Sequence, residues 1–192
     1  MALEKIIIAV CAHTGAGKNV FTEVANNLGY FCFDMGDVVR IIEPARRKIP
    51  REQMTKALEE QIRTELRQKY GQDAIARVAA EYIKDQQARI VFVSDVVSND
   101  EINYFKQQFG ENFYTVAVLA DYETRVKRVT SRAERPRDRS YVDNRDKWAT
   151  GLGLPQVLES AHYKIENNSD DLTEFQNNAR DFILRIVSEK AK

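Results

Sequence analysis

The chain has 192 residues, the length of one globular domain, and its 43% hydrophobic content suffices for a buried core. Lysine and arginine balance aspartate and glutamate at 29 each, so the net charge is zero and we expect no nucleic-acid or membrane partner. The two cysteines lack metal-ligand spacing, and the longest apolar run, residues 6–12, is too short to span a membrane; we expect a cytoplasmic protein.

The hydrophobic pattern predicts strands that alternate with helices. Largely apolar runs predict strands over residues 5–10, 30–34, 89–95 and 113–120, and we interpret residues 161–168 as a last short strand. Helical spacing predicts a helix from Lys18 to Gly29, mostly helical structure over 36–87, and helices over 101–109, 122–132 and 171–188. Strands separated by helices indicate an α/β domain, so we predict one domain over residues 1–192, with a parallel sheet of about five strands covered on both faces.

The stretch "IIIAVCAHTGAGKNVFTEVANNLG" resembles a phosphate-binding P-loop. An apolar strand, a glycine-rich turn, Lys18 and an amphipathic helix follow one another as that loop requires. The pattern G-x-x-x-x-G-K-[ST] is broken at both ends, by Ala12 and by Asn19. The alternative interpretation is a glycine-rich turn with an incidental lysine. We predict a nucleotide-phosphate site formed by His13, Thr14, Gly15, Ala16, Gly17, Lys18 and Asn19.

Asn19 stands where a Ser or Thr hydroxyl usually binds Mg²⁺. An Asn carbonyl is also an oxygen ligand, but it reaches further from the backbone and would hold the ion poorly or through water. We therefore predict Asn19 as a weak or indirect metal ligand. Lys18 is predicted to neutralise charge on the β- and γ-phosphates of ATP.

Two acidic segments follow predicted strands. In "FDMGDVVR" (33–40) we predict that Asp37 accepts the proton of an acceptor hydroxyl and that Arg40 binds the acceptor; alternatively, Asp34 or Asp37 caps the following helix. In "VFVSDVV" (91–97) we predict Asp95 as a metal ligand, although it fits equally well as a cap of the helix that starts near Asn99.

Two further segments complete the predicted site. Arginines recur from residue 125 to residue 145, and we predict that Arg128 and Arg132, four residues apart on one helix face, stabilise the transferring phosphoryl group from a lid over about 131–148. The alternative is a solvated charged face. In "ENNSDDLTEF" (166–175) we predict that Asn168 contacts the nucleotide base, whereas a helix cap at Ser169 or Asp170 explains the segment almost as well.

These segments together resemble the dephospho-CoA kinase and nucleoside monophosphate kinase branch of P-loop proteins, and most closely a largely archaeal dephospho-CoA-kinase-like family. The resemblance covers nearly the whole chain and rests on "HTGAGK" (13–18), "MGDVVR" (35–40), "YGQDAIAR" (70–77), "TVAVLADYETRVKRVTSR" (115–132), "NRDKWATGLGLPQVLESAHY" (144–163) and "NNSDDLTEF" (167–175). It implies a three-layer P-loop NTPase fold with an arginine-rich lid and an acceptor side in a helical insertion over about 41–87.

The sequence departs from that family where metal and acceptor are bound. The family has Gly at 12, Ser at 19 and an Asp-Gly-x-Arg run after the third strand, where this chain has Ala12, Asn19 and residues 94–97, Ser-Asp-Val-Val. The resemblance implies transfer of a phosphoryl group from ATP, with Mg²⁺, to dephospho-CoA or a nucleoside monophosphate. The alternative is a nucleotide-binding sensor or partner-binding protein with degenerate catalytic machinery.

Overall fold

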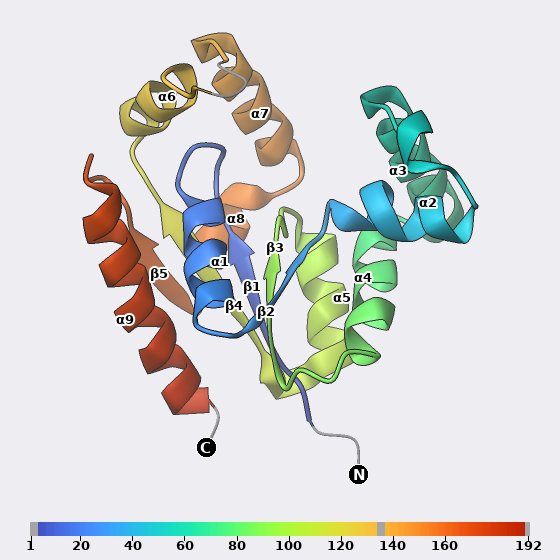
Figure 1. The fold of residues 1–192 in the computed structure, drawn as a ribbon, viewed down its shortest axis with the longest axis horizontal. Coiled ribbons are helices and arrows are strands. Elements are labelled where there is room, and N and C mark those ends of the chain that lie inside the picture. Colours follow the sequence, from blue (N-terminus) through green and yellow to red (C-terminus); the bar gives the residue numbers. More distant parts are fainter. Residues whose placement is uncertain (1–3, 134–136, 191–192) are drawn as a thin grey trace.

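The computed structural model describes residues 4–133 and 137–190. At its centre lies a five-stranded sheet in the order β2-β3-β1-β4-β5, in which all neighbouring strands are parallel (Figure 1). The predicted strands are present as β1 (Ile6–Cys11), β2 (Phe31–Asp34), β3 (Ile90–Ser94), β4 (Phe113–Leu119) and β5 (Tyr163–Glu166). The predicted α/β fold class is confirmed.

Helices cover both faces of this sheet. They are α1 (Lys18–Asn27), α2 (Glu43–Arg46), α3 (Lys56–Tyr70), α4 (Ala74–Lys84), α5 (Asn99–Phe109), α6 (Tyr122–Thr130), α7 (Arg139–Gly151), α8 (Leu154–Glu159) and α9 (Leu172–Lys190). A π-helix, η1 (Val38–Ile42), precedes α2, and the 3₁₀ turns η2 (Arg51–Gln53) and η3 (Gly110–Asn112) precede α3 and β4.

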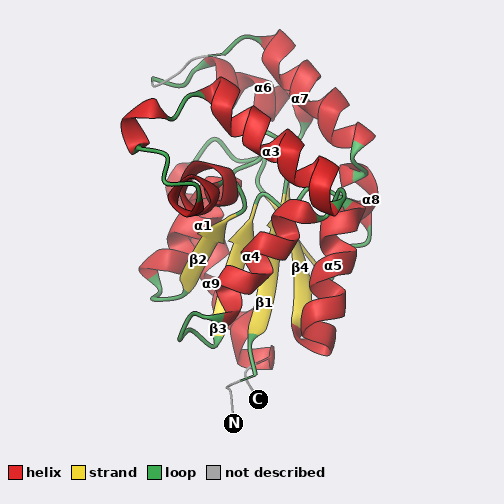
Figure 2. Cartoon of the chain, turned by 90° about the vertical axis from the view of Figure 1, so that its right-hand side faces the viewer, coloured by secondary structure: helices red, strands yellow, loops and turns green. Residues whose placement is uncertain are grey.

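The central strand β1 is buried on both faces, and its residues alternate between two cores. Ile6, Ile8 and Val10 join the core that α1 and α9 cover. Ile7, Ala9 and Cys11 join the larger core, to which α4, α5 and α8 contribute. Figure 2 shows α4 and α5 in front of the strands. Three layers result, with β1 in the middle of the sheet.

Part of the predicted helical insertion belongs to the layer that covers the sheet. Helix α4 has seven buried residues, among them Ala76, Ala79 and Ile83, and packs in the larger core. Its small side chains allow close packing of this helix against its neighbours. The segments η1, α2, η2 and α3 lie across the open end of the molecule from α6 and α7 (Figure 1), and buried residues of η1 and α3 join the larger core.

Both cysteines are free thiols. Cys11 is buried and Cys32 is half-buried, and burial raises the pKa of each, that of Cys32 to about 11. No helix in the described part of the chain combines the length and hydropathy that crossing a bilayer requires.

The site is placed by the strand order. From β1 the chain crosses to β2 and β3 on one side and later to β4 and β5 on the other. In parallel sheets, ligands bind outside the carboxyl ends of the strands, where the strand order reverses. Here that point follows Cys11, so the glycine-rich turn 12–17 lies at the position where such folds bind ligands.

Candidate functional site

The turn after β1 has the backbone geometry of an anion cradle. Gly15 and Gly17 have φ angles of 87° and 106°, in the left-handed region that side chains disfavour. A Cβ at Gly15 would lie 2.8 Å from the backbone oxygen of Arg125, and one at Gly17 would lie 2.2 Å from the Asn167 amide nitrogen. Helix α1 then begins at Lys18, and no side chain caps its first turn. Its N–H groups therefore remain available to an anion.

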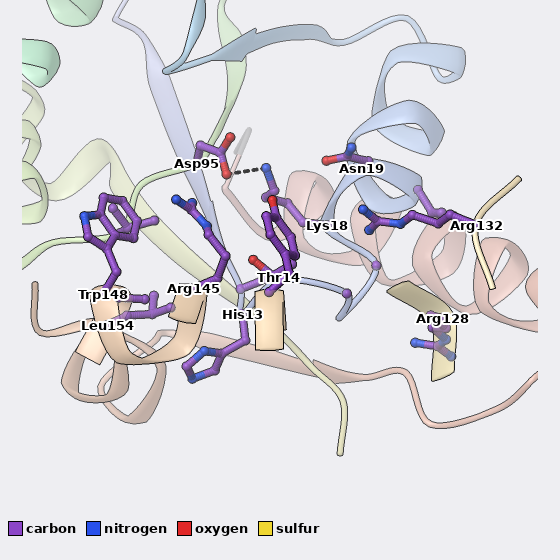
Figure 3. Close-up of a pocket in the computed structure, with 17 residues that line it drawn as sticks. His13, Thr14, Lys18, Asn19, Asp95, Arg128, Arg132, Arg145, Trp148 and Leu154 are labelled. Carbon is purple, nitrogen blue, oxygen red and sulfur yellow. Dashed lines mark hydrogen bonds and ion pairs between the residues drawn. The ribbon is translucent and has the colours of Figure 1, made fainter. Parts of the chain in front are cut away.

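Lys18 projects from this turn into a cavity and forms an ion pair with Asp95 (Figure 3). The Lys18 side chain is 15% exposed, whereas the Asp95 side chain is 45% exposed. Asp95 directly follows the end of β3 and has a φ of 65°, which is uncommon for a residue with a side chain. Such outliers cluster at functional sites.

Asp95 does not cap α5, so that alternative interpretation of the sequence is wrong. The cap is Ser98, whose hydroxyl accepts from the Glu101 backbone N–H while the Glu101 carboxylate accepts from the Ser98 N–H. The capping-box pattern Ser-x-x-Glu over 98–101 carried this signal in the sequence. The Asp95 carboxylate therefore takes no part in capping and lines the cavity instead.

The cavity above the turn has a volume of about 400 Å³. Its walls come from the turn, the start of α1, the end of β3, and helices α6, α7 and α8. The polar residues that line it include Thr14, Lys18, Asn19, Asp95, Arg128, Arg132 and Arg145. All of these except Arg145 were predicted site residues, and the structure brings them together; contact with a nucleotide remains a prediction for each.

Asn19 is exposed in the first turn of α1 and lies on the opposite side of Lys18 from Asp95 in Figure 3. Within residues 4–133 and 137–190, no three His, Cys, Asp or Glu side chains are grouped so as to hold a metal ion. The metal-binding roles of Asn19 and Asp95 therefore remain predictions.

His13 joins a network behind the turn. Its Nδ1 lies 3.0 Å from Asp146 Oδ1, and in Figure 3 its ring points away from Lys18. Arg125 binds both oxygens of Asp146, at 3.0 and 2.7 Å, and donates to the Thr14 carbonyl at 3.2 Å. Burial lowers the pKa of His13, although Asp146 acts in the opposite direction. These contacts fasten α6 and α7 to the turn.

Arg128 is hydrogen-bonded to the loop after β5. Its guanidinium donates to the Asn167 carbonyl and side-chain oxygens at 2.9 and 3.0 Å and to the Ser169 carbonyl at 2.6 Å. Helix α6 ends at Thr130, so the prediction that Arg128 and Arg132 share one helix face is wrong. Both still line the cavity. The predicted lid residues 134–136 lie outside the described residues.

The loop after β5 places Asn167 against the turn, and the predicted contact of Asn168 with a nucleotide base stays a prediction. The buried Asn167 amide donates to the Ala16 carbonyl at 2.8 Å, whereas Asn168 accepts from the Asp121 N–H where α6 begins. A cavity of about 230 Å³ lies beside them, with walls that include Val20, Leu172 and Phe175. Asp171 accepts from the Thr173 and Glu174 N–H groups and so caps α9; the cap predicted at Ser169 or Asp170 is wrong by one or two residues.

Asp37 and Arg40 bind each other. Arg40 Nη2 lies 2.9 Å from Asp34 and 3.0 Å from Asp37, so two carboxylates neutralise one guanidinium. Burial raises the pKa of Asp34, as does nearby Asp95, while Lys18 and Arg40 lower it. Asp37 does not cap a helix through its side chain. Neither Asp37 nor Arg40 is among the described residues that line the 400 Å³ cavity or the smaller one beside it.

The smaller cavity, about 160 Å³, lies between α3 and α7 and includes residues for which we predicted no role. Arg63 and Arg67 come from α3, and Arg145 and Trp148 from α7. The spacing of Arg63 and Arg67, four residues apart on a predicted helix, was the available signal. Asp95, Val97, Arg145 and Trp148 line both cavities, so the two spaces adjoin.

The fold and the glycine-rich turn define the class of the protein: it has a P-loop kinase-like fold. Solved structures that resemble it include TT1252 from Thermus thermophilus, with a TM-score of 0.64 and 20% identity over 96% of this chain and 98% of that one. A gluconokinase from Sinorhizobium meliloti has a TM-score of 0.60 and 14% identity over 98% of this chain and 97% of that one. Dephospho-CoA kinase from Campylobacter jejuni has a TM-score of 0.56 and 16% identity over 95% of this chain and 98% of that one. At these identities the likeness shows the fold alone.

The sequence assigns the family. A UPF0200/UPF0201 protein of Archaeoglobus fulgidus is 32% identical over 192 residues, which are 97% of this chain and 58% of that protein. UPF0200 proteins of Methanopyrus kandleri and Methanosarcina acetivorans are 31% and 30% identical over 187 and 190 residues, covering 95% and 96% of this chain and 91% and 98% of theirs. No family model matches. The chain belongs to the UPF0200 family.

Proposed function

We propose that this protein binds ATP at the glycine-rich turn and transfers its γ-phosphoryl group to a small acceptor. The observation that carries the proposal is the position of Lys18. It is the first residue of α1, whose start has no side-chain cap, and its side chain enters the 400 Å³ cavity that Arg128, Arg132 and Arg145 also line. Backbone N–H groups, a helix dipole and convergent cations are what a polyphosphate requires.

The proposed transfer uses residues from both cavities. The acceptor hydroxyl oxygen forms a bond to the γ-phosphorus. The bond between the γ-phosphorus and the oxygen that bridges it to the β-phosphorus breaks, and ADP leaves with the electron pair of that bond. Asp95 lines both cavities, and in this proposal it would take the hydroxyl proton, the role that was predicted for Asp37. Lys18 would neutralise charge on the β- and γ-phosphates, and the arginines would stabilise the transferring group.

The donor set fits Mg²⁺ only loosely. Asp95 supplies a carboxylate and Asn19 a carbonyl, both oxygen ligands that Mg²⁺ accepts, but they lie on opposite sides of Lys18 (Figure 3). Mg²⁺, when bound, would supply charge neutralisation of the phosphates. We propose that these two side chains hold it weakly or through water.

The acceptor proposed from the family resemblance is dephospho-CoA or a nucleoside monophosphate, and the solved dephospho-CoA kinase from Campylobacter jejuni shares the fold. A second candidate function is a nucleotide-binding sensor or partner-binding protein without useful transfer. The exposed Asn19 at the position of the metal-binding hydroxyl favours it. Incubation of the purified protein with γ-labelled ATP and an acceptor panel separates the two, because label on an acceptor supports transfer and bound but unconsumed ATP supports a sensor.

Asn19→Ser is expected to strengthen the dependence of the ATP affinity on Mg²⁺ about fivefold, or roughly 1 kcal/mol, and to raise turnover. The shorter hydroxyl side chain brings an oxygen to the fixed start of α1, where Mg²⁺ prefers ligands at about 2.0–2.1 Å. Calorimetric titrations with and without Mg²⁺ measure the difference. Asn26→Ser, at the far end of the same helix, should change neither quantity. Wild-type turnover of roughly 1–100 per second with Mg²⁺ would show that Asn19 is no handicap.

Asp95→Asn is expected to separate binding from transfer. The Lys18–Asp95 ion pair must open when a triphosphate binds the lysine, and a pair whose carboxylate is 45% exposed contributes about 0.2–1 kcal/mol. Metal-free ATP affinity should therefore rise by up to about fivefold. Turnover should fall, because the proton acceptor common to both cavities is lost. An unchanged turnover number would remove Asp95 from the proposed reaction.

A further inference from the structure

The cavity of about 160 Å³ carries an inference about the acceptor. It lies between α3 and α7 and adjoins the proposed ATP cavity through four shared residues, Asp95 among them. Figure 1 shows α3 and α7 on opposite sides of the open end of the molecule. A ligand in this space would thus be in reach of the end of β3, where Asp95 follows the strand.

The charged residues that line this cavity are three acidic residues, Glu60, Asp95 and Glu101, and three arginines. Three guanidinium groups line it, Arg63, Arg67 and Arg145, and among the described residues only Arg63 has an ion-pair partner, the exposed Glu60. Arg145 stacks on the Trp148 ring with its central carbon 4.3 Å from the ring centroid. The Nε of Arg67 is buried and has no hydrogen-bond partner. A buried donor without a partner is costly, and an anion would satisfy it.

Among the described residues, the acidic residues of the cavity leave two of its three arginines, Arg67 and Arg145, without an ion pair. Glu101 is 2% exposed, and its carboxylate accepts from the Val97 and Ser98 backbone N–H groups at 2.9 and 3.2 Å. Burial raises the pKa of Glu101, although those two hydrogen bonds and nearby Arg67 lower it. Asp95 is paired with Lys18. Arg40, the predicted acceptor clamp, has the opposite environment, because Asp34 and Asp37 already neutralise it.

The size and walls of the cavity limit what can bind. Its volume is about half the lower end of the roughly 300–1,000 Å³ typical of ligand pockets. Met35, Val39, Ile75 and Val97 supply apolar walls, and Trp148 supplies a flat one. These dimensions suit a compact molecule with one anionic group, and they are small for a nucleoside.

We propose that the acceptor is a compact hydroxylated anion, bound through its carboxylate or phosphate by Arg63, Arg67 and Arg145. The proposal rests on the proposed phosphoryl transfer and differs from the nucleotide-like acceptor that the family resemblance implies. Arg145 lies at the junction of the two cavities and so faces both the bound anion and the transferring group. Trp148, the single tryptophan of the chain, forms the wall beside them.

Trp148 also reports on the site, because it is the single tryptophan of the chain and lines this cavity as well as the proposed ATP cavity. Glycerol 3-phosphate, glycerate and glycerol are titrated separately into the full-length protein, and AMP serves as the nucleotide probe. Glycerol 3-phosphate or glycerate is expected to change the emission saturably, and the one that binds identifies the anionic group. Glycerol is expected to have no effect. Equal responses to glycerol and both anions, or a response to AMP alone, would overturn the proposal.

Variants locate the binding. Arg67→Gln and Arg63→Gln are each expected to weaken binding of the active anion about tenfold and to leave ATP affinity within about twofold. Arg77→Gln, an equal charge change at a half-exposed side chain of α4, is the matched control and should bind the anion normally. The Lys18→Ala variant should lose ATP affinity and still bind the anion.

Two outcomes would contradict these expectations. If Lys18→Ala abolishes anion binding and Arg67→Gln does not affect it, the anion binds at the glycine-rich turn and the inference is overturned. Anion binding through Arg67 without ATP binding would instead refute the proposed function.

Discussion

Lys18→Ala is expected to lower the affinity for ATP at least tenfold, about 1.4 kcal/mol, and to reduce any turnover by about 10²–10³. The lysine is the one ammonium among the described residues that line the 400 Å³ cavity, and only 15% of its side chain is exposed. Because the Lys18 ammonium is largely buried in this cavity, solvent screens its attraction to phosphate oxygens only weakly. Isothermal titration calorimetry with ATP measures the affinity, and a coupled assay measures the turnover.

Lys56→Ala is the matched control for this variant. Lys56 lies at the start of α3, its side chain is 78% exposed, and it pairs with Glu59 outside the cavity. The Lys56→Ala substitution removes the same charge and should leave the ATP affinity unchanged. Thermal unfolding without ATP establishes that Lys18→Ala is folded. Equal ATP affinities of wild type and a folded Lys18→Ala protein would refute the phosphate-binding role of the turn.

Asp146→Asn is expected to destabilise the protein by about 2–3 kcal/mol. Arg125, with 7% of its side chain exposed, then keeps its charge without a counter-charge, and its Nε already has no partner. Removing one member of a buried ion pair costs about 3–5 kcal/mol, and the expected loss is smaller because 22% of the Asp146 side chain remains exposed. Urea unfolding measures the change in the free energy of unfolding.

Glu123→Gln is the comparison for this prediction. Glu123 pairs with Arg139 and likewise connects α6 with α7, but both side chains are more than half exposed. The loss should stay below about 1 kcal/mol. Similar losses for the two variants would mean that the network of His13, Arg125 and Asp146 does not fasten the two helices to the turn more strongly than a surface pair does.

The fold could be predicted because its signals are local. Four of the strands, β1 to β4, are short and largely apolar runs, and the turn from Gly15 to Lys18 carries its own backbone chemistry. The helix boundary at Thr130 carried no glycine or proline signal, so the position of Arg132 was predicted on a helix that ends two residues earlier. The Ser98–Glu101 capping box was present in the sequence and would have excluded a cap at Asp95.

The partners within the site depend on distant contacts that spacing does not encode. Arg125 and Asp146 are 21 residues apart, and Asn167 lies 151 residues from its acceptor at Ala16. Two neighbouring asparagines, Asn167 and Asn168, are equivalent in the sequence, and only the end of β5 decides which one turns toward the P-loop. Similarly, Arg40 is neutralised by residues three and six positions away, whereas the buried Nε of Arg67 has no hydrogen-bond partner.

A crystal structure of the complex with a non-hydrolysable ATP analogue tests the central claim most directly. The account predicts that the β- and γ-phosphates lie on the backbone N–H groups of residues 15–19, with Lys18 Nζ within hydrogen-bond distance of a phosphate oxygen and no longer on Asp95. A triphosphate bound elsewhere, with the Lys18–Asp95 ion pair intact, would contradict it.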